Sequence, residues 1–135
     1  MKLITLIKSD IPYSKKNLLY FLLAYFCQPS FRLILNYRIG NFLIRRNGFL
    51  RHLIASRLMF CQTKNWSCQI SFRAKIGEGV KFAHPIGIVI GNDVTIHKNV
   101  TIYQQVTIGS HGRNFERDYP IIEEGVVIFS GAKVF

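Results

Sequence analysis

Four histidines are the side chains of this sequence best suited to proton transfer or metal binding, because an imidazole titrates near neutral pH. His52 and His97 are expected at the surface, and the role of His111, in a polar insertion, is ambiguous. His84 differs because it lies at the edge of a repeat, just before a Pro-Ile-Gly turn. His84, His97 and His111 could meet at a metal only across subunits, and no close-spaced His or Cys pair supports zinc, so we expect no metal.

The three cysteines, Cys27, Cys61 and Cys68, are an odd number without metal-like spacing, so we expect reduced thiols. The start of the chain lacks the features of a signal peptide. The longest apolar run, Leu18 to Cys27, has ten residues, about half of what a membrane-spanning helix needs. These features favour a cytoplasmic protein.

The formal net charge of +11 is concentrated in the first half of the chain. Residues 1–69 hold eleven Lys or Arg against the single acid Asp10, whereas residues 70–135 hold seven against six. No recognition motif supports nucleic-acid binding, and we expect none. Two interpretations stay open for the basic half: a solvated face, or peripheral contact with anionic lipid at the inner face of the plasma membrane.

The elements that must position these side chains follow from a period of six in the second half of the chain. Apolar residues, nine of them Ile or Val, recur at this spacing with one break: Ile70, Ile76, Phe82, Ile88, Val94, Val100, Val106, Ile122, Ile128 and Val134. This period is neither helical nor a strand alternation, and it is typical of a β-helix with about 18 residues per triangular coil. Gly, Asn and Asp fall between the apolar positions, where corners require them.

The sequence before the repeat predicts helices over residues 14–27, with Ser14 as the N-cap, 30–46 and 49–61, after an extended or irregular segment 1–13. We therefore expect a basic α-helical segment over 1–69 and a β-helix over 70–135. A polar loop over 110–120, an insertion of ten residues into the ladder, is where a site is expected. Because the ladder stops at Val134 without a terminal cap, we expect a shortened form of a longer protein, or an end covered by something else.

A resemblance now becomes visible. The stretch AKIGEGVKFAHPIGIVIGNDVTIHKNVTIYQQVTIGS, residues 74–110, resembles the left-handed β-helix acyltransferases of the serine acetyltransferase type. So does the loop ending in Tyr119-Pro120 with the following IIEEGVVIFSGAKVF, and FRLILNYRIGNFL, residues 31–43, is similar to the end of that family's helical domain. The resemblance covers roughly residues 30–135, and it implies a left-handed parallel β-helix preceded by helices.

The resemblance also implies an activity: acetyl transfer from acetyl-CoA to a hydroxyl, without a metal, between the subunits of a homotrimer. It gives His84 the role of general base, for which a largely neutral imidazole is suited. It places Gly109, Ser110 and Ser130 at the acetyl-CoA arm.

Three departures from the family pattern concern the acceptor. Ala83 stands where the family has an Asp before the histidine, and Gln69 stands where it has an Asp that orients the histidine. Asp118-Tyr119 replaces an Arg-His pair in the loop. A site that binds an amino acid needs such charges, whereas a sugar needs neutral hydrogen-bond partners and an aromatic platform, which Gln69, Asn114 and Tyr119 can supply.

The leading hypothesis is therefore an O-acetyltransferase for a sugar hydroxyl of a capsule, exopolysaccharide or lipopolysaccharide precursor, with Gln69, Asn114, Asp118 and Tyr119 contacting the acceptor. Two alternatives stay open: a serine O-acetyltransferase with an altered site, and a catalytically inactive structural or membrane-docking module.

Overall fold

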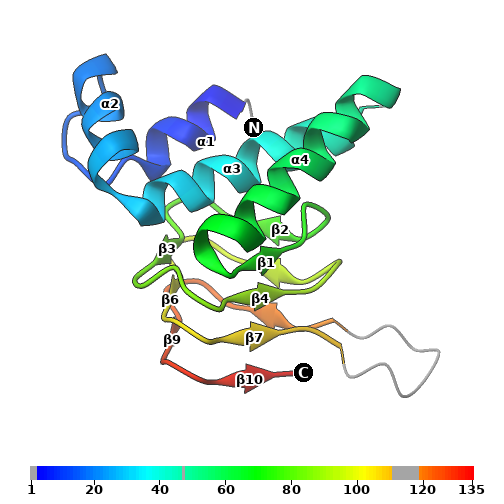
Figure 1. Cartoon of the computed structure of the whole chain (residues 1–135). Helices are drawn as coiled ribbons and strands as arrows, with labels where there is room; N and C mark the ends of the chain where they lie inside the picture. The colour runs from blue at the N-terminus through cyan, green and yellow to red at the C-terminus, as the bar shows by residue number, and fades with distance from the viewer. Residues whose placement is uncertain (1–2, 47, 111–118) are drawn as a thin grey trace.

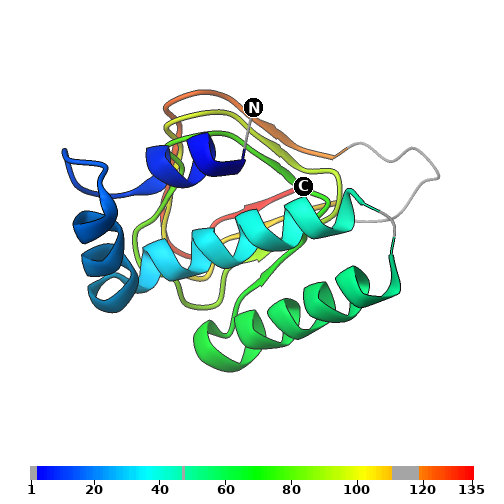
Figure 2. The same cartoon turned by 90° about the horizontal axis from the view of Figure 1, so that it is seen from above.

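The structure, a computed structural model, describes residues 3–46, 48–110 and 119–135. A layer of helices covers one end of a stack of β-coils (Figure 1). Seen along the stack, the coils superpose in a triangular outline beneath the helices (Figure 2). The predicted fold class, a left-handed parallel β-helix preceded by a small helical segment, is confirmed.

The described strands form three parallel sheets, one on each side of the triangle. Sheet A has the order β1-β4-β7-β10, sheet B the order β2-β5-β8, and sheet C the order β3-β6-β9. Each strand has two residues: β1 (Gln69–Ile70), β2 (Lys75–Ile76), β3 (Lys81–Phe82), β4 (Val89–Ile90), β5 (Thr95–Ile96), β6 (Thr101–Ile102), β7 (Thr107–Ile108), β8 (Ile121–Ile122), β9 (Val127–Ile128) and β10 (Lys133–Val134). From β1 to β9 the second residue of each strand is buried.

The buried positions follow two tracks, which corrects the predicted ladder. The second strand residues form one track, and the other lies two residues earlier, with Ile88, Val94, Val100 and Val106 fully buried. The predicted spacing passes from the first track to the second after Phe82, because the first coil carries two extra residues there. Ala83 pairs with Tyr103 and Gly87 with Gln105, so residues 84–86 stand opposite the single Gln104.

The polar insertion is correspondingly shorter than predicted. Ile122 follows Ile108 by fourteen positions, eight more than one hexapeptide rather than ten. The missing two are the extra residues beside His84. Because both tracks point inward, a change from one to the other keeps Ile and Val in the core, and the six-residue count alone does not reveal it.

The helices are α1 (Leu3–Asp10), α2 (Leu18–Cys27), α3 (Pro29–Ile44) and α4 (Phe49–Trp66). The prediction that residues 1–13 are extended or irregular is wrong, because α1 is a helix despite the β-branched Ile4, Thr5 and Ile7. Its packing on α3 outweighs that local preference.

The start of α2 also differs from the prediction. Asn17 is its N-cap and accepts a hydrogen bond from the backbone N–H of Tyr20, whereas Ser14 lies outside the helix. At the other end of the helical segment, α4 continues five residues beyond the predicted Cys61.

Within the described residues, no single helix is long and apolar enough to cross a membrane. By length and composition, α2 and α3 pass that test only as a pair, and they are bent by 108° at their junction.

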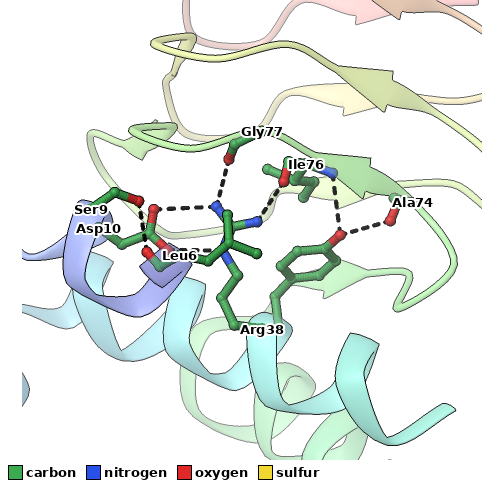
Figure 3. Close-up of polar contacts among 8 residues, drawn as sticks. Leu6, Ser9, Asp10, Arg38, Ala74, Ile76 and Gly77 are labelled. Atoms are coloured by element: carbon green, nitrogen blue, oxygen red, sulfur yellow. Dashed lines mark hydrogen bonds and ion pairs between the residues drawn. The ribbon is translucent and has the colours of Figure 1, made fainter. Parts of the chain in front are cut away.

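Side chains of α3 and α4 supply hydrogen-bond partners to the first coil, which has no coil above it. The Tyr37 hydroxyl donates to the carbonyl of Ala74 at 2.6 Å and accepts from the N–H of Ile76 at 3.2 Å (Figure 3). Asn41 Nδ2 donates to the Phe72 carbonyl at 2.6 Å, and the N–H of Ile70 donates to Gln62 Oε1 at 2.8 Å. Unpaired buried backbone groups are costly, so these contacts fix the helical layer on the coil. Ala74 and Phe72 are themselves buried.

Arg38 joins three parts of the molecule. Its Nε donates to the carboxylate of Asp10 at 2.8 Å, and its terminal nitrogens reach the carbonyls of Ile76 and Gly77 (Figure 3). The two charged side chains are 3% and 1% exposed. Burial raises the pKa of the Asp10 carboxyl above its ordinary value, and the hydrogen bond and charge of Arg38 oppose that rise.

Gly40 marks the closest approach of α3 to the first coil. A Cβ at this position would lie 2.3–2.5 Å from ring atoms of the buried Phe72. A glycine here therefore lets the helix lie directly on the ring.

We expect Arg38→Met to lower the free energy of unfolding by about 3–5 kcal/mol at neutral pH, because it leaves Asp10 buried without its partner. Without Arg38 the pKa of Asp10 rises further above its unfolded value. The folded state then binds the proton more tightly, so part of the loss should be recovered as the pH falls below the folded-state pKa. Urea unfolding at two pH values measures both effects. The exposed Arg73→Met should cost less than about 0.5 kcal/mol, and equal losses in the two variants would contradict the role of Arg38.

We expect Gly40→Ala to cost about 1–3 kcal/mol, because its methyl group overlaps Phe72. Combining it with Phe72→Leu should cost less than the sum of the two single changes, as measured by chemical denaturation. The control is Gly109→Ala, whose added Cβ meets no atom within 4 Å. Strict additivity of the first two changes would show that the overlap is not the cause.

Candidate active site

His84 lies on a corner of the triangle, in the turn that leads from β3 to β4. We call this turn and its equivalents in the later coils, β6 to β7 and β9 to β10, the His84 corner. The side chain of His84 is exposed, and its carbonyl accepts a hydrogen bond from the N–H of Ile86 at 2.8 Å. The two extra residues of the first coil therefore form a tight bend that projects the imidazole outward.

The end of α4 and the residues after it hold this bend. The carbonyl of Trp66 accepts from the N–H of Gly87 at 3.4 Å and from the thiol of Cys68 at 3.2 Å. The Cys68 sulfur accepts in turn from the N–H of Ile88 at 3.4 Å. On the other side, the N–H of Gln105 donates to the carbonyl of Ile86 at 2.9 Å. Backbone on both sides thus fixes the position of His84.

Two aromatic rings lie next to His84 in the following coils. The ring centroids of His84 and Tyr103 are 6.0 Å apart, and those of Tyr103 and Phe129 are 5.6 Å apart and nearly parallel. Phe129 is 69% exposed. The rings form an apolar ledge that runs down the corner from the imidazole, and such a surface can stack against a flat apolar face of a ligand.

Gln104 adds a polar group to the same corner. Its Oε1 is buried and has no hydrogen-bond partner among the described residues. A buried acceptor without a donor is costly, so a ligand that brings an N–H or O–H here would gain a hydrogen bond.

The sequence did not single out Tyr103, Gln104 or Phe129. Aligning the coils by their strand register would have placed these three residues at the corner of His84. Tyr103 and Phe129 each follow a buried strand residue, as Ala83 does, and Gln104 occupies the same corner position as Ser130.

The predicted site residues divide between two corners. Ser130 lies at the His84 corner, and Gln69 is exposed at the start of β1, where it pairs with Val89 just after that corner. Gly109 and Ser110 follow β7 at the opposite end of sheet A, which we call the Gly109 corner. Tyr119 belongs there too, because its ring lies 3.9 Å from a Cβ built on Gly91.

The two corners are about 15 Å apart along one chain, since five extended residues link Gln104 to Gly109. The two groups of predicted residues therefore do not meet within one copy. Asn114 and Asp118, like His111, lie outside the described residues.

The chemistry available to His84 is proton transfer. Within the described ranges, its ring contacts Tyr103, and no carboxylate is bonded to it. His97 is exposed on another corner, 3.9 Å from Glu123. No cluster of three or more possible metal ligands occurs among the residues that the structure describes.

Comparison with known proteins finds serine acetyltransferases similar to this chain in both sequence and structure. The serine acetyltransferase of Haemophilus influenzae is 36% identical over 105 residues, which are 78% of this chain and 38% of that protein. The crystal structure of serine acetyltransferase from Vibrio cholerae superposes with a TM-score of 0.78 at 27% identity, covering 97% of this chain and 51% of that one. A serine acetyltransferase in complex with CoA gives 0.77 at 30% identity, covering 97% and 54%. No family model matches the chain.

The chain thus spans about two fifths of the length of the first of these relatives and about half of the two solved chains. The likeness covers both the helical layer and the coils, because nearly all of this chain is included in the structural superpositions.

We expect the thiol of Cys68 to react slowly. Burial raises its pKa above the usual value, so less of it is the reactive thiolate at any given pH. The exposed Cys27 should be alkylated at least about tenfold faster, as measured by timed alkylation and mass spectrometry of peptides. Comparable rates in the folded protein would contradict the geometry of the bend and would make Cys68 a candidate nucleophile.

Proposed function

Because the chain is of the serine acetyltransferase type in sequence and fold, we propose that it transfers an acetyl group from acetyl-CoA to a hydroxyl. The observation that carries the proposal is His84, projected from a rigid corner of a fold shared with a serine acetyltransferase in complex with CoA. The activity of the whole protein is part of the proposal, since the chain spans only part of its relatives.

In this mechanism the neutral imidazole of His84 accepts the proton of the acceptor hydroxyl. The oxygen attacks the thioester carbonyl, and the tetrahedral intermediate collapses by breaking the carbon–sulfur bond. The imidazolium then gives the proton to the CoA sulfur, so that His84 is neutral again and CoA leaves as the thiol. Cys68 takes no part, because it is buried and its raised pKa makes it a poor nucleophile.

The donor is assigned to the Gly109 corner. Gly109 has a negative φ, and a Cβ added to it would meet no atom within 4 Å, so neither the backbone nor packing in this chain requires a glycine. The space beside it suits the thin arm of acetyl-CoA, with Ser110 next to it. Ser130 is a second donor contact on the His84 side.

The separation of the two corners supports a site shared between copies. Since the His84 corner and the Gly109 corner lie about 15 Å apart in one chain, a neighbouring copy that brings its Gly109 corner to His84 would complete the site. A head-to-tail contact of this kind closes into a ring in a homotrimer, where each copy contributes its His84 corner to one site and its Gly109 corner to another.

Two acceptors have separate support. The β-hydroxyl of L-serine is favoured by the relatives, all three of which are named as serine acetyltransferases. A sugar hydroxyl is favoured by the neutral surroundings of His84, where Ala83 and Gln69 replace acids and the Tyr103–Phe129 ledge offers a stacking surface. We place L-serine first, because 36% identity over 105 residues is the broader observation.

We expect His84→Ala to lower the rate of acetyl-CoA consumption by about a hundredfold or more, which is the usual effect of losing a general base. The measurement is release of CoA thiol by the 135-residue chain with excess acceptor. His97→Ala removes another exposed imidazole and should retain the rate. If His84→Ala keeps full activity while its circular dichroism is unchanged, the base is another group.

The acceptor is decided by running the same assay with L-serine and with a panel of hexoses and nucleotide sugars. Fast CoA release with L-serine alone supports the first acceptor, and release with a sugar alone supports the second. If neither acceptor is used and calorimetry detects no CoA binding, the transferase proposal fails and the inactive module stands.

A further inference from the structure

The helical layer holds a pocket of about 710 Å³ that is separate from both corners of the candidate site. It lies where the end of α2, the start of α3 and the end of α4 meet, and Figure 2 shows these three segments around one side of the layer. Its lining includes Tyr25, Arg32, Asn36, Lys64 and Trp66.

Cations of this pocket lack partners. Arg32 Nε is buried without a hydrogen bond, and no ion pair involves Arg32 or Lys64 within the described residues. Asp10, the one acid in residues 1–69, already pairs with Arg38. A buried guanidinium nitrogen without an acceptor is unfavourable, and phosphate oxygens are the acceptors that Arg binds best.

An apolar surface adjoins the pocket. Tyr25 links the two, since it lines the pocket and its ring packs edge-on against Phe26 of α2. The other face of α2 packs inward through Ala24. The outer face has the i, i+1, i+4, i+5, i+8 spacing of one helix side and consists of residues 41–72% exposed: Leu18, Leu19, Leu22, Leu23 and Phe26.

The outer side of α4 has the same apolar character. Phe49, Leu50, Leu53, Ile54 and Phe60 are each at least 42% exposed. Arg51, Arg57 and Lys64 lie on the same helix and are exposed, and α4 has no acid. Exposed apolar side chains next to basic ones are the pattern of a helix that lies in a membrane interface.

We infer that the helical layer binds an anionic phospholipid surface, with a lipid phosphate seated in the pocket at Arg32 and Lys64 and the apolar face of α2 in contact with the acyl region. The charge of the helical layer favours an anionic lipid over a second copy of the chain as the partner of this surface. Two such faces would bring cations against cations with no acid in either, which is unfavourable. An anionic bilayer neutralises the same charges and accepts the apolar side chains.

The experiment is co-sedimentation of the full 135-residue chain with vesicles. We expect binding to vesicles that contain phosphatidylglycerol, weaker binding at high salt, and little binding to pure phosphatidylcholine. Arg32→Gln should weaken binding about tenfold, and Lys64→Gln should also weaken it. Arg73→Gln, the same change on the exposed β-helix, should retain full binding.

Two further measurements distinguish the contact of α2 with the acyl region from the binding of the lipid phosphate in the pocket. Leu22→Ser with Phe26→Ser should lose vesicle binding, whereas competition by inorganic phosphate or glycerol phosphate should need far higher concentrations than lipid. Free phosphate that competes as well as lipid would reduce the site to an anion pocket and overturn the lipid surface.

Two further results would overturn the inference. One is equal binding of the Arg32 and Arg73 variants to anionic vesicles. The other is a chain that does not bind vesicles but forms a dimer in light scattering, if the Leu22 and Phe26 changes dissociate that dimer. Circular dichroism of each variant confirms that it is folded.

Discussion

The structure depends on how the open end of the β-helix is closed. The backbone N–H and C=O groups of each coil form hydrogen bonds with the coils on either side. The first coil has a neighbouring coil on one side only. Helices α3 and α4 replace the missing neighbour with side chains. Tyr37 and Asn41 pair with carbonyls of the coil, Gln62 pairs with an N–H, and Arg38 reaches two more carbonyls while it holds α1 through Asp10. The polar groups buried in this interface thus set how helices sit on coils.

The same interface positions the candidate base. α4 leads directly into the first coil, and Trp66 and Cys68 hold the bend that carries His84. The helical layer and the His84 corner are therefore held together, since the carbonyl of Trp66 at the end of α4 accepts a hydrogen bond from the turn that presents the imidazole. The exposed apolar side chains of α2 and α4 take no part in holding this bend.

The coils themselves contribute spacing more than chemistry. Each side of the triangle separates two corners by an extended run. His84 and Gly109, which are proposed to act on one acetyl group, therefore lie at different corners of one chain. In the proposed homotrimer, a neighbouring copy would bring these two corners together. Tyr103, Gln104 and Phe129 make the described part of the His84 corner neutral and partly aromatic. These surroundings favour a sugar acceptor, whereas the relatives favour L-serine.

The six-residue period determined the β-helix by itself, because a local repeat imposes the same turn on every coil. The sequence also located His84 at a corner. Only the tertiary structure revealed that the ladder changes track after Phe82, since two inward positions per hexapeptide are chemically alike. Only tertiary structure explains why α1 is a helix, because its contacts with α3 outweigh the low helix propensity of its β-branched residues. It alone showed that Gly109 and His84 lie at different corners and that Arg38 pairs with Asp10, because these relations join residues far apart in sequence that no local pattern links.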